Sequence, residues 1–168
     1  VPVRYAALLY GGDRFESRDR LLALVTDHDL VILDRYVASN IAYNAAKVPG
    51  HEQADLITWI DQLEFGMFDL PRPDLTLLLA TSTALADRLV GEKAARSYTD
   101  QTRDMHEANR GYLDQVAYVY GQLAAAGGDS WLTVDPTDSS GNLRPPDDIA
   151  AGIWLHPRLA GLGHIRST

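Results

Sequence analysis

The sequence contains no cysteine, so disulfide bonds and thiolate metal sites are excluded. It also lacks an apolar run of roughly 18 residues, the length that a membrane-spanning helix requires, because polar side chains interrupt the longest runs within a turn or two. No basic and apolar leader opens the chain, so no secretory signal is expected, although the first residue is valine rather than methionine. Together these absences favour a cytoplasmic protein without a membrane partner.

Positive charge is scarce and is carried almost entirely by arginine. The 168 residues include 23 Asp and Glu against 15 Lys and Arg, for a formal charge of −8, and lysine occurs only at Lys47 and Lys93. This balance argues against a nucleic-acid partner, which needs a positive stripe. The forked guanidinium of arginine suits a bidentate grip on phosphate, so the bias is compatible with a small phosphorylated ligand. A genome rich in G and C would produce the same bias.

Apolar residues at helical spacing predict several helices. Residues 4–27 carry this spacing on both sides of Gly11-Gly12, which predicts two helices or one interrupted helix. Ser82 or Thr83 is expected to cap a helix that runs through Val90. The remaining predicted helices lie around residues 56–64, around residues 112–126 before Gly127-Gly128, and around residues 149–155.

Three short apolar runs predict strands, at residues 30–33, 75–79 and 131–134, the first of them buried on both faces. Strands that alternate with helices predict one α/β domain over residues 1–168, with a parallel sheet and helices on both faces. Ligands in such folds bind at the carboxyl ends of the strands. The charged stretch 91–104 predicts a mobile surface loop or lid.

A carboxylate and a guanidinium follow the first predicted strand. Asp34 and Arg35 come directly after residues 30–33, at the edge of the sheet where ligands are expected. Asp34 can hold a magnesium ion or one of its waters, and Arg35 can grip a phosphate. The structural alternative is that Asp34 caps the next helix while Arg35 pairs with a neighbouring acid. Taken alone, the two residues favour that alternative.

In its wider context the pair resembles the thymidylate kinase family. The motif is an apolar strand followed by Asp34-Arg35-Tyr36, then Ser39, and then Ala42-Tyr43. Further blocks similar to the family are residues 8–14, 63–65, 70–74, 84–88, 104–107 and 119–123. The similarity runs from about Tyr5 to Val134 and is strongest to actinobacterial members, which share the Val-Ala-Ser-Asn run after Asp-Arg-Tyr. The tail from Gly152 onward matches nothing recognisable.

This resemblance implies a P-loop-kinase-like α/β fold whose parallel sheet has the strand order 2-3-1-4-5. The three predicted strands would be strands 3, 4 and 5. It also implies an enzyme that phosphorylates dTMP to dTDP with ATP and magnesium, in the synthesis of dTTP. Family members are cytoplasmic homodimers that pair through helices, and apolar surfaces on residues 5–9 and 56–63 would serve that purpose.

The resemblance assigns three residues to the base. Tyr10 would lie against the pyrimidine ring. Arg14 would donate a hydrogen bond to a thymine carbonyl, at a position where cytosine carries an amine. Asn40 would form the remaining hydrogen bonds to this edge of the base. The alternatives are that Tyr10 is a core residue and that Arg14 forms a surface ion pair with Asp13.

The phosphate and sugar contacts implied by the resemblance fall near the Asp-Arg-Tyr motif. Arg35 would bind the substrate phosphate, and Ser39 would belong to the same binding set. Tyr43 would pack beside the sugar, where a ribose 2′-hydroxyl would collide with it; as a helix residue it fits a core position equally well.

The remaining implied roles belong to phosphoryl transfer. Lys93, Arg96 and Arg103 would fold over the transferring group, with Arg96 as the first choice, and Asp34 would also act in catalysis. Each cation fits a solvated surface as well. Arg88 would lie against the adenine of ATP. Asp34 and Glu107 would help to hold magnesium, although a solvent-facing carboxylate is the simpler account of Glu107.

One family motif does not occur in the sequence. The P-loop, Gly-x-x-x-x-Gly-Lys-Ser/Thr, cradles the phosphates of ATP, and neither lysine follows a glycine at that spacing. In the family order, the strand that feeds this loop lies between the strands expected at residues 30–33 and 75–79. Its removal would leave unpaired backbone groups that cost about 1–3 kcal/mol each. We therefore expect an upstream segment of roughly 50 residues with a βαβ unit, and kinase activity is conditional on it.

Two other functions remain open on the sequence alone. One is another deoxynucleotide kinase of the same fold, against which Tyr10, Arg14, Asn40 and Tyr43 argue together. The other is a nucleotide-binding or dimerisation module without catalysis, which has lost its P-loop. The sequence before Val1 separates the enzyme from the binding module.

Overall fold

The computed structural model describes residues 1–82, 85, 86, 88, 103–160 and 162, without the side chains of residues 103–109 and 160. These residues form two compact units. The first unit contains residues 1–74 and 118–123, and the second contains the described parts of residues 75–117 and 124–168.

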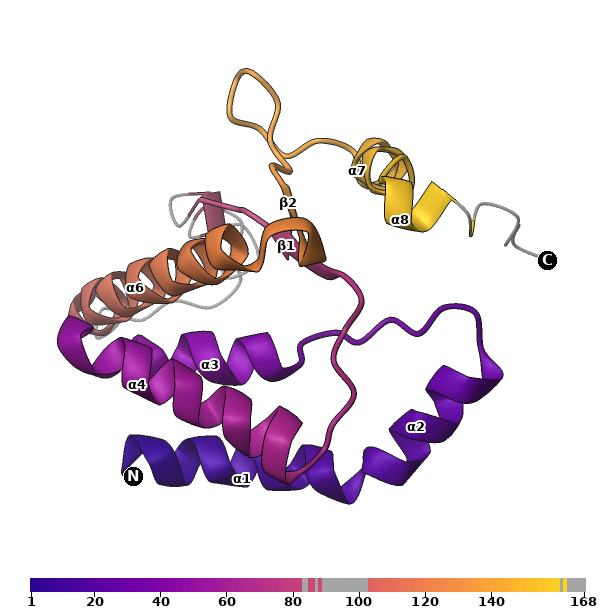
Figure 1. Ribbon diagram of the computed structural model, residues 1–168. Coiled ribbons are helices and arrows are strands. Elements are labelled where there is room, and N and C mark those ends of the chain that lie inside the picture. Colours follow the sequence, from indigo (N-terminus) through magenta and orange to yellow (C-terminus); the bar gives the residue numbers. More distant parts are fainter. Residues whose placement is uncertain (83–84, 87, 89–102, 161, 163–168) are drawn as a thin grey trace. The chain divides into compact units, whose positions relative to one another are not determined.

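The first unit is built of helices. They are α1 (Val3–Glu16), α2 (Arg18–Asp27), α3 (Val37–Ala45) and α4 (Gly50–Asp61), which continues as the π-helical turn η1 (Gln62–Met67). Helices α1, α3 and α4 pack against one another (Figure 1). Leu123 of α6 (Arg103–Gly127) lies against the core that they form. The buried apolar residues of this core are Ala7, Val37, Ile41, Leu56, Ile60 and Leu70.

Helix α1 approaches its neighbours closely because its inner face carries small residues. Ala7 and Gly11, one turn apart, are both buried. A Cβ atom at Gly11 would lie 3.1 Å from Cε2 of Phe68 and 3.5 Å from Cγ of Glu64. Two helices form over the predicted range 4–27, but the break falls at Ser17 and the glycine pair lies inside α1. Gly11 therefore makes room for a neighbouring helix instead of ending its own.

The prediction of a strand at residues 30–33 is wrong. This segment has no regular secondary structure, and Ile32 and Leu33 are 79% and 43% exposed. A strand needs a neighbouring backbone to complete its hydrogen bonds. Within the part of the chain that the structure describes, the only sheet has two strands, and neither pairs with this segment. The strand 3 expected from the family resemblance is therefore not formed here.

The second unit contains the sheet. Strands β1 (Thr76–Leu79) and β2 (Trp131–Val134) pair in parallel, with Thr76 opposite Trp131. Parallel neighbours require a long crossover, and α6 lies between the two strands in the chain. The predictions of these two strands and of an α/β fold with a parallel sheet are confirmed.

Helix α6 ends in a tight connection to β2, through the 3₁₀ helix η3 (Gly128–Ser130). Gly128 has a φ of 52°, a conformation in which glycine avoids the Cβ penalty. Gly127 is needed for space, because a Cβ atom there would lie 2.0 Å from Cδ1 of Trp131. The prediction that Gly127-Gly128 ends this helix is confirmed.

Two predictions at helix starts also hold. Ser82 Oγ accepts a hydrogen bond from the Leu85 backbone N–H at 3.2 Å, as a capping residue does. Residues 83, 84, 87, 89 and 90 of that predicted helix lie outside the described residues. The last predicted helix is α7 (Pro146–Trp154), which is followed by the short α8 (Pro157–Ala160).

The loop between β2 and α7 is held by its own side chains. Asp135 accepts hydrogen bonds from the hydroxyl and backbone N–H of Thr137, and these bonds lower the pKa of its carboxyl group. Asp138 accepts backbone N–H groups from Asn142 and Ser140, which lowers its pKa in the same way.

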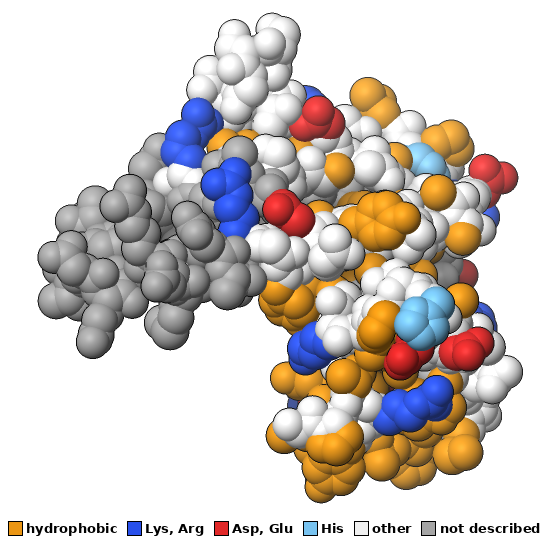
Figure 2. Space-filling view, turned by 90° about the vertical axis from the view of Figure 1, so that its left-hand side faces the viewer, with side chains coloured by type: hydrophobic (Ala, Val, Ile, Leu, Met, Phe, Trp, Pro, Cys, Tyr) orange, Lys and Arg blue, Asp and Glu red, His pale blue; other side chains and the backbone are white. Residues whose placement is uncertain are grey.

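Helix α1 exposes several apolar side chains, namely Tyr5, Leu8, Leu9, Tyr10 and Phe15. Tyr5, Leu8 and Leu9 follow helical spacing and share one side of the helix. Hydrophobic side chains gather in the lower part of Figure 2, at the level of α1. Among the described helices, none combines the length and the apolar character needed to cross a bilayer.

Candidate substrate-binding site

The Asp-Arg-Tyr motif forms the turn that leads into α3. Asp34 and Arg35 are both exposed, and Arg35 has a φ of 63°. This left-handed conformation costs a residue with a Cβ atom about 1–2 kcal/mol, and such strain collects at functional sites. The N-cap residue of α3 is Tyr36, without a capping side chain, so Asp34 is not the helix cap that the structural alternative required.

Arg35 lies beside Tyr43 of α3. Its Cζ atom is 5.2 Å from the centre of the Tyr43 ring, within the range of a cation–π contact. The Tyr43 phenol is also the main cause of a raised Arg35 pKa. The residues predicted to contact the phosphate and the sugar are therefore adjacent to each other.

Ser39 forms a hydrogen bond with a residue of α6. Its Oγ atom is 2.7 Å from the hydroxyl of Tyr120. Burial raises the pKa of Tyr120, and the bond to Ser39 opposes that shift. The phenol thus stays protonated at neutral pH, so the two hydroxyls hold each other in place beside Arg35 and Tyr43.

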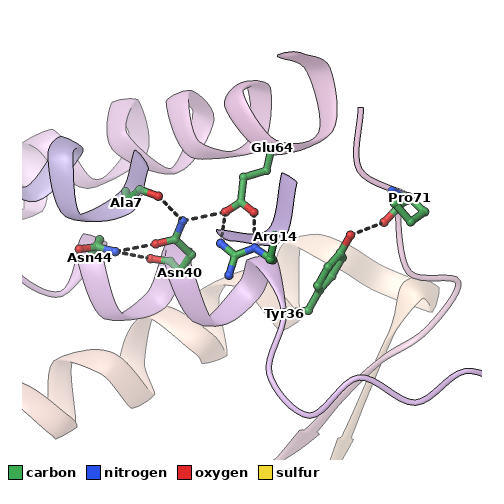
Figure 3. A network of polar contacts seen from close by, with 7 residues as sticks. All are labelled: Ala7, Arg14, Tyr36, Asn40, Asn44, Glu64 and Pro71. Atoms are coloured by element: carbon green, nitrogen blue, oxygen red, sulfur yellow. Dashed lines mark hydrogen bonds and ion pairs between the residues drawn. The ribbon is translucent and has the colours of Figure 1, made fainter. Parts of the chain in front are cut away.

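Arg14 belongs to a buried polar network (Figure 3). Its Nε and Nη2 atoms donate to Oε2 and Oε1 of Glu64 at 2.5 and 2.6 Å. The Glu64 side chain is fully buried, whereas that of Arg14 is 19% exposed. The carboxylate that pairs with Arg14 thus comes from η1, fifty positions along the chain, and not from the adjacent Asp13.

Asn40 completes this network from α3. Its amide nitrogen donates to the Ala7 carbonyl oxygen at 2.9 Å and to Glu64 Oε1 at 2.7 Å, and its Oδ1 atom accepts from Asn44 at 2.8 Å (Figure 3). Asn40 is 4% exposed. Both amide N–H groups are therefore used inside the protein, and a base contact by Asn40 has only the second lone pair of Oδ1 available.

Tyr36 lies at the edge of the network. Its hydroxyl donates to the Pro71 carbonyl oxygen at 3.1 Å (Figure 3). Burial raises the pKa of Tyr36 to about 12, the negative charge of Glu64 adds to this rise, and Arg14 opposes it. Tyr36 is consequently a hydrogen-bond donor throughout the physiological pH range.

Tyr10 lies one turn before Arg14 on α1 and is 60% exposed. The alternative of a core position for Tyr10 is therefore wrong. An exposed tyrosine ring offers a flat face for stacking. Residues four apart on a helix lie on the same side, so the ring of Tyr10 and the guanidinium of Arg14 emerge from one side of α1.

The residues predicted for phosphoryl transfer are described less fully. Lys93 and Arg96, with most of the predicted lid 91–104, lie outside the described residues. Arg103 and Glu107 belong to α6, but their side chains are not described. Arg88 is exposed and donates to the Gly141 carbonyl oxygen at 3.5 Å.

Asp34 is the described carboxylate for which magnesium binding is predicted. Where the structure describes side chains, no three His, Asp or Glu residues cluster as a metal site would require. Magnesium in kinases is commonly held by one or two carboxylates together with substrate phosphates and water. One exposed carboxylate, Asp34, beside an arginine that is predicted to bind phosphate, Arg35, is compatible with that arrangement.

Sequence reasoning missed two residues of the site, Glu64 and Tyr120. Both lie inside segments that resemble the family, but neither was given a role. A signal for Glu64 was present, because it continues the apolar positions 56, 60 and 63 along the buried side of α4 and η1. A carboxylate at such a position needs a partner.

Comparison with known proteins agrees with these motifs. The family model described as thymidylate kinase matches residues 2–144. Thymidylate kinases from two strains of Mycobacterium tuberculosis are each 37% identical over 146 residues, which cover 84% of this chain and 68% of theirs. The thymidylate kinase of Dictyostelium discoideum is 34% identical over 91 residues, covering 54% of this chain and 36% of its own. The chain therefore belongs to the thymidylate kinase family.

Proposed function

We propose that this protein binds dTMP in its first unit and phosphorylates it to dTDP with ATP and magnesium. The observation that carries the proposal is the family match over residues 2–144. The first unit supports it, because the ring of Tyr10 and the guanidinium of Arg35 are exposed and available to a base and a phosphate.

Two residues of α1, Tyr10 and Arg14, would bind the base. Tyr10 stacks on the pyrimidine through its exposed ring. Glu64 occupies the Nε–H and one Nη2–H of Arg14, and a guanidinium has five N–H donors. The remaining donors, which have no partner among the described residues, bind the 4-carbonyl of thymine. Cytosine presents an amine at that position and is rejected.

The phosphate would be held at the start of α3. Arg35 donates to the phosphate from its strained turn, and Ser39 adds a hydroxyl. Tyr43 packs beside the deoxyribose, where it excludes a 2′-hydroxyl. Its contact with Arg35 restrains the guanidinium before the ligand arrives, which lowers the entropy lost on binding.

The transfer of the phosphoryl group would depend on further residues. ATP supplies the phosphoryl group, and magnesium neutralises its developing charge when bound. In this proposal Asp34 would hold the metal, and Glu107, Lys93, Arg96 and Arg103 keep the roles that the family resemblance implies for them. Arg88 lies against the adenine.

We also propose that the protein works as a cytoplasmic homodimer. The apolar stripe on α1 supports this, since Tyr5, Leu8 and Leu9 are between 40% and 55% exposed. Two-fold pairing would bury this stripe against its copy, and closed two-fold dimers are the commonest assembly.

Thermal stability in the presence of nucleotides tests the substrate. A ligand that binds only the native state raises the free energy of unfolding by about 2.7 kcal/mol at a concentration one hundred times its Kd. At equal concentrations, dTMP should therefore raise Tm more than dCMP, dGMP or UMP. Equal shifts with all four nucleotides would contradict the thymidylate assignment.

Substitution of Arg35 tests the phosphate contact. Arg35→Ala keeps the Cβ atom and hence the backbone strain, but removes a charge-assisted hydrogen bond of roughly 1.5–3 kcal/mol. The affinity for dTMP should fall by one to two powers of ten, at about 1.4 kcal/mol for each tenfold change. Thymidine, which has no phosphate, should bind as before. Arg20→Ala, on the exposed side of α2, is the matched control and should change neither affinity. A parallel loss of thymidine and dTMP binding would make Arg35 a structural residue.

A further inference from the structure

Glu64 occupies a position where an apolar side chain would be expected. It follows Ile60 by one helical turn, and both residues are fully buried on the core side of α4 and η1. A buried ion pair is often no more stable than apolar side chains of similar volume at the same place. Stability of the fold therefore does not by itself account for a carboxylate here.

The backbone around Glu64 is also unusual. It lies in the six-residue π-helical turn η1, and such turns are rare and frequently occur at functional sites. The η1 turn is tied to the following loop, because the Leu70 backbone N–H donates to the Glu64 carbonyl oxygen at 3.0 Å. On the facing helix, Gly11 leaves room for the Glu64 side chain to approach α1.

The carboxylate restrains two of the residues assigned to base recognition. It accepts both Nε and Nη2 of Arg14, which fixes the plane and the rotation of the guanidinium. It also accepts the Asn40 amide, which is in turn bonded to Ala7 and Asn44. Figure 3 shows Glu64 between Arg14 and Asn40, so one carboxylate joins α1 and α3 through η1.

Glu64 leaves a defined set of Arg14 N–H groups available to a ligand. A bidentate pair through Nε and Nη2 directs Nη1 and the second Nη2 proton away from the carboxylate. The arginine side chain keeps 19% of its surface exposed, whereas Glu64 keeps none. The pair thus presents the N–H donors of Arg14 to a ligand, while the carboxylate of Glu64 is shielded. This arrangement favours a ligand with a carbonyl acceptor over one with an amine donor.

We propose that Glu64 is a positioning residue that orients Arg14 to select a pyrimidine with a 4-carbonyl over one with a 4-amine. This inference rests on the proposed function, in which Arg14 reads the base. Glu64 does not touch the nucleotide; it acts through the guanidinium that it holds.

Glu64→Gln tests the proposal with little change in volume. The amide oxygen still accepts one hydrogen bond, but the amide nitrogen cannot accept from Arg14 and the negative charge is lost. The ratio of dTMP to dCMP affinity should fall by about tenfold, the effect of about 1.4 kcal/mol in lost base discrimination. Thymidine and dTMP should weaken by the same factor, because the defect lies at the base. This pattern differs from Arg35→Ala, which should spare thymidine.

Matched variants separate positioning from folding. Asp61→Asn removes a carboxylate that also accepts a bidentate arginine, Arg72, at the surface of the same helix. It should leave discrimination unchanged. In an Arg14→Met background, Glu64→Gln should cause no further loss of discrimination, since the residue through which it acts is gone. Affinities are measured by calorimetry at a temperature where every variant is folded.

A second substitution covers the case in which Glu64→Gln does not fold. Arg14→Lys retains one ion pair with Glu64, but the lysine ammonium lacks the planar guanidinium that Glu64 would orient. It should reduce the ratio of dTMP to dCMP affinity to the same extent. A stable Arg14→Lys variant with the parent's discrimination would overturn the proposal.

The remaining outcomes are distinct. Glu64→Gln with a lower Tm but an unchanged dTMP to dCMP ratio would overturn this inference alone and leave Glu64 as a structural residue. A further loss in the Arg14→Met background would overturn it as well, because Glu64 would then act by another route. A parent protein that binds dTMP and dCMP equally would refute the proposed function and this inference with it.

Discussion

Removal of Arg14 should destabilise the protein far more than removal of a surface arginine with the same bonding pattern. Arg14→Met leaves the fully buried carboxylate of Glu64 with Asn40 as its neighbouring donor. Breaking a buried pair by removing one partner costs about 3–5 kcal/mol. Arg14→Met should therefore lower the free energy of unfolding by about 3–5 kcal/mol.

Arg72 provides the control. It donates two hydrogen bonds to Asp61 at 2.9 and 2.7 Å, but its side chain is 63% exposed and that of Asp61 is 38% exposed. Exposed pairs contribute about 0–1 kcal/mol, and the guanidinium of Arg72 also lies 4.1 Å from the centre of the Phe65 ring, a contact worth about 0.5–1 kcal/mol at an exposed site. Arg72→Met should therefore cost no more than about 2 kcal/mol. Both variants remove a guanidinium that donates two hydrogen bonds to one carboxylate, which is buried for Arg14 and partly exposed for Arg72.

Urea unfolding followed by tryptophan fluorescence measures both losses, because Trp59 is half-buried against the core of the first unit. With a slope of about 2 kcal/mol per molar urea, the midpoint of Arg14→Met should fall by about 1.5–2.5 M. The double variant Arg14→Met/Glu64→Gln removes both charges and should recover at least about 1 kcal/mol of the loss. If Arg14→Met costs no more than Arg72→Met and the second substitution recovers nothing, the carboxylate is solvated and the reasoning fails.

Four further predictions follow from particular contacts. The pKa of Tyr36 is about 12 in the folded protein and about 10 when unfolded, so the unfolded state releases this proton first and stability falls as pH rises from 10 to 12. Tyr36→Phe should reduce that fall in urea titrations at several pH values; an identical pH dependence would contradict the shift. Gly127→Ala places a Cβ atom 2.0 Å from the Trp131 ring and should lower the free energy of unfolding by about 1–3 kcal/mol, whereas an unchanged midpoint would show that the ring moves aside without cost. Arg35→Gly should raise Tm, because it relieves a left-handed residue worth about 1–2 kcal/mol, while it weakens dTMP binding as Arg35→Ala does; a lower Tm would mean that the turn is not strained. Light scattering should report a dimer for the parent and a monomer for Leu9→Glu, which adds a charge to the exposed stripe of α1, and a monomeric parent at micromolar concentration would refute the proposed assembly.

Local patterns in the sequence determined much of the architecture. The helical spacing of apolar residues predicted the second half of α4 and the end of α6, because amphipathic periodicity is a property of neighbouring residues alone. The apolar runs at 75–79 and 131–134 became paired strands, and the Asp34-Arg35-Tyr36 motif identified the family. The same kind of run at residues 30–33 did not become a strand, because strand formation depends on a neighbouring backbone that local sequence does not specify.

The character of the site was decided by contacts between distant segments. Nothing near Arg14 in the sequence indicates that its partner lies fifty positions away, on a π-helical turn that faces the small residues of α1. Asn40 was predicted to face a base, yet its amide donors are used inside the protein by Ala7 and Glu64. The sequence determined which polar groups the site contains, since their chemistry belongs to the residue type. Only the tertiary structure decided which of them face a ligand and which support the others, because a buried polar group takes whichever partners the packing brings within hydrogen-bonding distance.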